Sequence, residues 1–136
     1  MKKFVLISAL LFLTAPAWAA EMELKGIMKD LDAKTQAIVE GINKGDFEAI
    51  GNNARKISGH VEPSFSEKVR ILGFLLTDAK DFKSFGDVVH DEAERLAEAA
   101  KKKDYDGAVV HFSALLRGCA GCHAGYREKF VKYFYK

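Results

Sequence analysis

Proline is almost absent from this chain, and that absence limits the folds open to it. After residue 19 the only proline is Pro63. The long stretches on either side of Pro63 carry apolar residues at spacings of three and four instead of strict alternation. Proline interrupts helices, and these spacings gather apolar side chains on one helical face. The sequence therefore predicts an all-α protein.

Four long helices are expected from this periodicity. They cover about residues 22–42, 47–58, 84–100 and 104–133, and Asp81 is an alternative start for the third. Gly45 suits the C-terminal end of the first helix, and Asp46 is placed to cap the second. The lysine run 101–103 suits the end of the third, because cations are favourable at a helix C-terminus. Amphipathic helices with short connections are typical of an antiparallel four-helix bundle.

The segment from Glu67 to Lys80 does not fit this simple pattern. Its apolar residues are too dense for a helix with one buried face: Val69, Ile71, Leu72, Phe74, Leu75 and Leu76. We expect a short, buried helical stretch that covers another part of the fold. Residues 59–66, which include Pro63, are expected to form the connection before it.

Residues 1–19 have the layout of a secretory signal peptide. Lys2 and Lys3 precede an apolar run from Phe4 to Leu13, and a small-residue cleavage pattern ends at Ala19. The run is about half as long as the roughly 20 residues that cross a bilayer, which argues against a permanent anchor. Residues 20–136 are then expected to be a single exported domain, and the bacterial periplasm is the expected compartment.

The charge balance limits the classes of partner. The chain has 21 Lys and Arg against 19 Asp and Glu, which is a formal net charge of +2. Both surplus cations, Lys2 and Lys3, belong to the signal segment, so residues 20–136 are formally neutral. A neutral domain lacks the basic excess that nucleic-acid binding requires. No nucleic acid, and no membrane after signal cleavage, is expected as a partner.

Both cysteines of the chain lie in the run Cys119-Ala120-Gly121-Cys122-His123. This spacing is the attachment signature of c-type haem, in which two thiols anchor the porphyrin and the adjacent imidazole binds the iron. One alternative is a disulfide or a redox-active thiol pair, although the α/β pattern that usually surrounds a redox-active pair is missing. Zinc is a weaker alternative, because these three residues would need a fourth ligand.

A helix through this motif presents its three reactive side chains on one side. Successive helical residues turn by about 100°, so Cys119, Cys122 and His123 fall within an arc of about 100°. Further apolar residues near the same arc are expected to form a bed for the porphyrin: Phe112, Leu115, Leu116, Tyr126 and Phe130. One helix is thus expected to carry the covalent anchors, the proximal ligand and part of the haem environment.

With this motif near the C-terminus of a four-helix chain, the sequence resembles the class II cytochromes c. That family comprises cytochrome c′ and the low-spin cytochrome c-556 type. The sharp part of the resemblance runs from Asp104 to Arg127. It implies one covalently bound haem c in a four-helix bundle, with Arg127 packed near His123. The chain lacks the Tyr-Arg pair that family members often carry in helix one near a haem propionate, and Lys25 or Arg117 is a candidate to replace it.

The resemblance makes the residue opposite His123 decisive for function. A methionine from helix one gives a low-spin electron carrier, whereas an apolar residue leaves an open iron that binds NO or CO. Met28 lies a full turn inside the first helix on its apolar stripe, whereas Met22 is expected to fray. We therefore predict Met28 as the distal ligand, against the alternative of a plain core residue. Three histidines are weaker candidates, as one shares the helix of His123 and two are expected to be solvated: His111, His60 and His90.

These expectations describe a periplasmic electron carrier and not an enzyme. Met/His coordination raises the haem potential relative to two histidine ligands. Redox proteins are the expected partners, and a basic set could steer an acidic one: Arg117, Arg127, Lys129, Lys132 and Lys136. The alternative function is a five-coordinate cytochrome c′ that binds NO or CO. The family commonly pairs through helices one and two, which makes a homodimer one of the states open to this chain.

Overall fold

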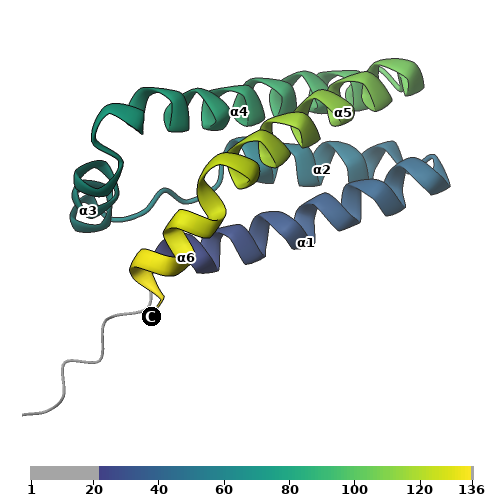
Figure 1. Cartoon of the computed structure of the whole chain (residues 1–136). Helices are drawn as coiled ribbons and strands as arrows, with labels where there is room; N and C mark the ends of the chain where they lie inside the picture. Colours follow the sequence, from purple (N-terminus) through teal and green to yellow (C-terminus); the bar gives the residue numbers. More distant parts are fainter. Residues whose placement is uncertain (1–21, 136) are drawn as a thin grey trace, which may run out of the picture.

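The computed structural model describes residues 22–135, and these form a four-helix bundle (Figure 1). The long helices are α1 (Glu23–Lys44), α2 (Phe47–Ser58), α4 (Ala79–Lys101) and α5 (Tyr105–Cys122). Residues 22–135 contain no strand. The prediction of an all-α four-helix bundle is confirmed, whereas the predicted signal segment, residues 1–19, lies outside the described residues.

Local contacts fix three helix boundaries at the predicted positions, two at the start of a helix and one at its end. The Asp46 carboxylate accepts a hydrogen bond from the Ala49 N–H at 2.9 Å, and the Asp104 carboxylate accepts one from the Gly107 N–H at 2.9 Å. Each bond satisfies an N–H group that has no partner inside its own helix. Gly45 ends α1 with a φ of +68°, a left-handed conformation that favours glycine. Short turns therefore join α1 to α2 and α4 to α5.

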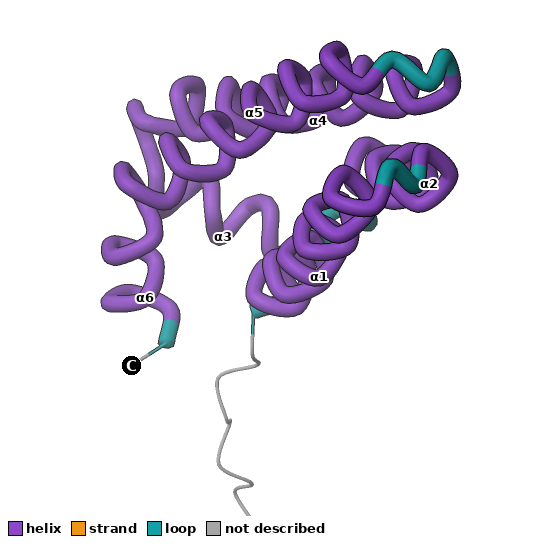
Figure 2. The backbone as a smooth tube through the Cα atoms, turned by 90° about the vertical axis from the view of Figure 1, so that its right-hand side faces the viewer, coloured by secondary structure: helices purple, strands orange, loops and turns teal. Residues whose placement is uncertain are grey.

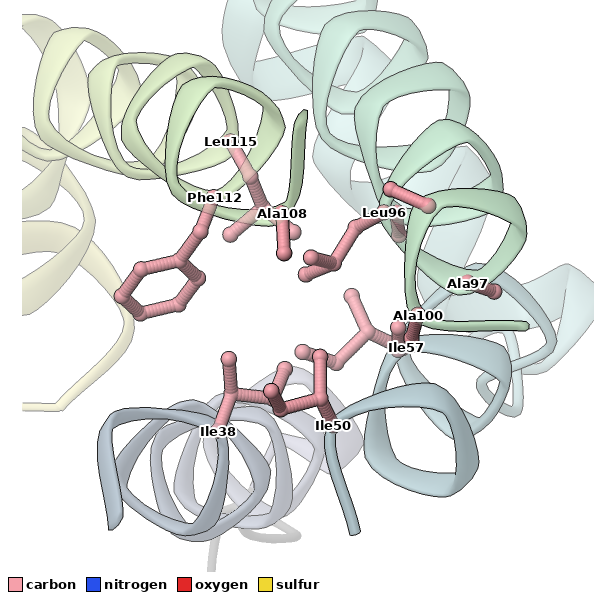
Figure 3. Close-up of a cluster of buried hydrophobic side chains, with 12 residues drawn as sticks. Ile38, Ile50, Ile57, Leu96, Ala97, Ala100, Ala108, Phe112 and Leu115 are labelled. Atoms are coloured by element: carbon pink, nitrogen blue, oxygen red, sulfur yellow. The ribbon is translucent and has the colours of Figure 1, made fainter. Parts of the chain in front are cut away.

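The bundle core is apolar and lies between the four long helices (Figure 3). Its largest fully buried side chains come from every one of them: Ile38, Ile50, Ile57, Leu96 and Leu115. On α4 the core-facing residues are mostly alanines, among them Ala97 and Ala100. Small side chains on this face let α4 lie close to both α2 and α5, its main neighbours.

Gly118 lets α5 approach α4 just before the cysteine motif. A Cβ at Gly118 would lie 2.9 Å from Val89 Cγ2 and 3.2 Å from Val88 Cγ1. We expect Gly118→Ala to lower the free energy of unfolding by about 1–3 kcal/mol, because over-packing forces neighbours to move. Urea unfolding measures this loss. Gly86→Ala on α4 is the matched control, since its Cβ would meet nothing within 4 Å; equal losses in both variants would contradict the close approach.

A short helix, α3 (Phe65–Leu75), and a 3₁₀ turn, η1 (Leu76–Asp78), connect α2 to α4. α3 lies across one end of the bundle (Figure 1). One face of α3 buries Ile71 and Leu75, but Leu72 on the other face is 55% exposed. The expectation of a buried covering stretch is therefore wrong for half of this helix. α4 also begins earlier than the expected start at Asp81 or Ser84.

The expected fourth helix is divided into three parts. α5 ends at Cys122, a π-helical segment η2 (His123–Arg127) follows, and α6 (Glu128–Phe134) comes last. We call residues 122–134 the arm. Hydrogen bonds in a π-helix span five residues instead of four, so the side chains after Cys122 leave the regular 100° progression. The expectation of one regular helix through this region is wrong in that respect. Single π-turns inside α-helices are frequent at functional sites, and this one begins at His123.

The bundle is open on one side at the end that carries α3 and α6. α1 packs mainly on α2, and α5 mainly on α4, while α1 and α5 have little contact with each other. Figure 2 shows the two pairs diverging toward this end. A second cluster of buried side chains partly fills the opening: Met22, Ile71, Leu75, Tyr126 and Phe130.

Candidate functional site

A cavity of about 410 Å³ lies in this open end, between α1 and the arm. The first turns of α1 contribute Leu24, Lys25 and Met28 to its lining. The arm contributes a larger set: Cys122, His123, Tyr126, Arg127 and Phe130. Cavities of this size with apolar and aromatic walls and a few convergent polar groups are typical of cofactor sites.

Cys119 and Cys122 lie one helical turn apart on α5, and both thiols are free and half-buried. Cys122 lines the cavity, whereas Cys119 packs against the bundle core. Burial raises the pKa of both the Cys119 and the Cys122 thiol. A redox-active thiol pair needs the opposite shift, toward a thiolate at neutral pH. These surroundings therefore do not favour thiol–disulfide chemistry.

Met28 and His123 reach the cavity from different walls, since Met28 is on α1 and His123 begins η2. Met28 is 37% exposed and belongs to neither buried cluster, which does not fit the alternative of a core residue. Met22 is only 2% exposed and packs with Tyr126 and Phe130. The expectation that Met22 frays is therefore wrong, because the second cluster holds it in place.

Only some of the residues predicted to surround the haem lie at the cavity. Tyr126 and Arg127 line the cavity beside His123. Phe112 and Leu115 do not line it, because they are buried in the bundle core with 7% and 0% exposure. α5 is enclosed by its neighbours at these earlier turns, and the cavity begins only near the cysteine motif.

The other histidines of the described residues do not line the cavity. His111 Nδ1 lies 2.8 Å from a Glu92 carboxylate oxygen, and this hydrogen bond lowers the pKa of Glu92. His90 is half exposed on α4. His60 Nδ1 lies 2.9 Å from the Val61 carbonyl oxygen in the connection after α2. His123 is thus the histidine that the fold brings to Met28 and Cys122.

A buried carboxylate on α3 holds the start of α1 at the cavity. Glu67 is 4% exposed, and its two oxygens accept hydrogen bonds from the N–H groups of Glu23 at 2.8 Å and Leu24 at 2.7 Å. These N–H groups have no partner within α1. The Glu23 carboxylate accepts the N–H of Ser64 at 2.7 Å, and this bond lowers the pKa of Glu23. The starts of α1 and α3 therefore cap each other, one turn before Met28.

Sequence reasoning missed this exchange between helices, although a signal was present. Ser64 and Glu67 form the S-x-x-E pattern of a capping box, in which the glutamate normally turns back to its own N-cap residue. The Ser64 hydroxyl does accept the Glu67 N–H, at 3.4 Å. The Glu67 carboxylate, however, crosses to α1. The pattern therefore marks the start of α3, but its glutamate caps the start of α1 and not the start of its own helix.

The residues at the cavity fit a covalently bound haem. Two free thiols at positions i and i+3, an imidazole next to the second thiol and a thioether on another helix are the residue types that hold c-type haem. Tyr126 and Phe130 give the porphyrin an aromatic wall. Lys25 and Arg127 supply cations at the same cavity, which suits the carboxylates of a haem.

The family model for cytochrome c′ matches residues 62–127, a range that contains both cysteines, His123 and Arg127. The chain belongs to the cytochrome c′ family. It is therefore a class II c-type cytochrome, of a family that carries covalently bound haem c. Members of the cytochrome c′ family are electron carriers or gas binders and are typically periplasmic. No curated protein and no solved structure matched the chain.

The match begins after Met28 and therefore does not cover α1, which lines the cavity opposite His123. Lys25 Nζ lies 5.6 Å from the centre of the Tyr135 ring at the cavity. Arg117 is exposed on α5 and does not line the cavity. Of the two candidates to replace the missing Tyr-Arg pair, Lys25 has the better position.

The basic set expected to steer partners is partly neutralised in this cytochrome. Lys129 pairs with Asp78 at 3.6 Å, and Lys132 pairs with Glu128 at 2.6 Å. Lys136 lies outside the described residues. Within residues 22–135, no helix is both long and apolar enough to cross a membrane.

Proposed function

We propose that this class II cytochrome c is a low-spin electron carrier in which His123 and Met28 would hold the haem iron. Cys119 and Cys122 would hold haem c, which when bound would supply reversible one-electron exchange between its ferric and ferrous states. The observation that carries the proposal is the position of Met28. It stands exposed in the cavity that His123 lines from another element.

The residues of the chain have separate tasks in this proposal. The two cysteines fix the porphyrin to α5, while Tyr126 and Phe130 exclude water from one wall, being 8% and 6% exposed. The Glu67 carboxylate fixes the first turn of α1 and so limits the movement of the Met28 thioether. Ligands that stay in place in both oxidation states keep the reorganisation on electron exchange small, and the hydrophobic shell tunes the potential.

Covalent attachment through the cysteines is tested by extraction. We expect the mass of the exported protein to exceed that of residues 20–136 by one haem, and the colour to stay with the chain in acid–acetone. Replacing both thiols, with Cys119→Ser and Cys122→Ser together, should release all colour from the chain, because no thioether bond can form. A wild-type chain that loses its colour on extraction would instead support a disulfide or thiol role.

Carbon monoxide separates an electron carrier from a gas-binding cytochrome c′. With Met28 bound, the spectrum of the reduced protein is expected to change little when CO is added, because both axial positions are taken. An open distal side would give a rapid spectral shift. A wild-type protein that takes up CO readily would therefore support the alternative function.

We further propose that residues 20–136 work in the periplasm after removal of residues 1–19. Redox proteins would meet the domain at the cavity mouth, where Lys25 and Arg127 favour an acidic surface. Contacts of this kind bury little area and are short-lived, which suits a carrier that must exchange partners. No catalytic reaction of its own is proposed for the domain.

A further inference from the structure

Gly121, which stands between the two cysteines of the motif, lies directly against an aromatic ring of α4. A Cβ at Gly121 would lie 2.5 Å from Phe85 Cε1 and 3.1 Å from Phe85 Cδ1. Real Cβ atoms do not approach other atoms so closely, so the Phe85 ring occupies the space that a larger residue would need. A side chain at position 121 would have to displace this ring, and packed neighbours resist such a shift.

The Phe85 ring also contacts Tyr126, which follows His123 in the chain. The two ring centres are 6.3 Å apart and their planes meet at 69°, an edge-to-face arrangement that aromatic pairs favour. Phe82, one turn earlier on α4, meets Tyr126 in the same way, at 5.3 Å and 90°. Phe85 and Cys122 both pack against the second buried cluster. Aromatic rings of α4 therefore hold Tyr126 in place.

The two contacts of Phe85 lie on either side of His123, where the helix is irregular. η2 begins at His123, and the hydrogen bonds of a π-helix leave the regular α-helical pattern. Gly121 comes two residues before His123 and Tyr126 three residues after it, so Phe85 holds the chain at both ends of this stretch. Phe85 does not itself line the cavity. It therefore acts on His123 through the chain and not by direct contact with a cofactor.

We propose that Phe85 is a positioning residue that sets the direction of the His123 imidazole at the haem site. The proposal rests on the proposed function, in which His123 is a ligand of the haem iron. Groups behind a metal ligand orient it and tune its bond to the metal, and a ligand is held only as precisely as its supporting packing allows. A plain core role for Phe85 would change the free energy of unfolding but not the bond between His123 and the iron.

The iron–histidine stretching band in the resonance Raman spectrum of the reduced protein tests this role. The parent protein is haem-loaded residues 20–136 with Met28→Ala, because the band is observed when the distal position is open. Adding Gly121→Ala should shift the band to lower frequency, because displacing the Phe85 ring lets the imidazole tilt. Gly125→Ala is the matched control, since it lies in η2 and its Cβ would meet nothing within 4 Å; it should leave the band in place.

Phe85→Leu is the second variant, because it removes the obstacle to a Cβ at position 121. Leucine lacks the ring atoms Cε1 and Cζ, which lie 2.5 Å and 3.3 Å from that Cβ. Phe85→Leu alone should also shift the band, because Tyr126 loses its contact with the ring. In the Phe85→Leu background, however, Gly121→Ala should shift the band by less than about half as much as in the parent, because two residues in contact have non-additive effects.

Three results would overturn the proposal, provided that circular dichroism shows each variant folded. The first is a Gly121→Ala band that shifts no further than that of Gly125→Ala. The second is a Gly121→Ala shift of equal size with and without Phe85→Leu, because the ring would then not carry the effect. Either result leaves the proposed function intact. The third is a five-coordinate parent without the band, which would overturn the assignment of His123 and this proposal with it.

Discussion

Met28→Ala is expected to open the distal side of the haem and to lower the reduction potential by on the order of 100 mV. The thioether favours the ferrous state, so its loss removes that preference. The ferric variant should lose the weak far-red band that methionine ligation gives, and the reduced variant should take up CO readily. Optical titration at controlled potentials measures all three changes in one sample.

Met22→Leu is the matched control for Met28→Ala. Met22 is buried in the second cluster beside the same cavity, with 2% exposure. Leucine has a similar volume, so this exchange costs less than about 1.5 kcal/mol of stability. Its spectrum, potential and CO response should match the wild type. If Met22→Leu opens the distal side and Met28→Ala does not, the assignment of the ligand to Met28 is wrong.

Glu67→Ala is expected to lower the free energy of unfolding by about 3 kcal/mol. The substitution removes the carboxylate that accepts two hydrogen bonds from the first turn of α1, donated by the N–H groups of Glu23 and Leu24, and leaves both N–H groups without their acceptor. Guanidinium unfolding of the haem-loaded protein measures the loss. Glu98→Ala, at an exposed position on α4, is the control and should stay within about 0.5 kcal/mol of the wild type.

A merely local cap would affect stability alone, whereas Glu67 is placed to affect the ligand as well. Loosening the first turn of α1 should speed CO uptake by the reduced Glu67→Ala variant, because Met28 lies one turn further along. Lowering the pH should also weaken the contact between the starts of α1 and α3. The folded state holds the pKa of Glu23 below its ordinary 4.5, so the bond to Ser64 contributes stability above that pH and loses it as the pH falls toward the lowered value. Unchanged CO uptake in Glu67→Ala would contradict the positioning role.

Features of the fold that depend on neighbouring residues could be predicted from the sequence. Asp46 and Asp104 cap helices through N–H groups three residues ahead, and Gly45 ends α1 by its own conformation. The cysteine motif is equally local, since one turn of α5 sets the spacing of its thiols. The presence of Tyr126 and Arg127 at the cavity also follows from short distances along the chain.

Features that depend on distant contacts could not be predicted in this way. Periodicity gives α3 two apolar faces but does not say that only one of them meets the core, which leaves Leu72 exposed. The burial of Met22 needs Tyr126 and Phe130 from the other end of the chain. The arc calculation for Phe112 assumes an open side along all of α5, whereas the bundle encloses this residue. Each of these outcomes is decided by which helices pack together.

The most direct test of Met28 ligation is the proton NMR spectrum of the reduced protein. A methionine methyl group bound to the iron lies over the porphyrin, whose ring current moves its signal far upfield of all other methyl signals. One such signal is expected in the wild type and in Met22→Leu, and none in Met28→Ala. A wild-type spectrum without it, or its persistence in Met28→Ala, would contradict the assignment of Met28 and His123 as the axial pair.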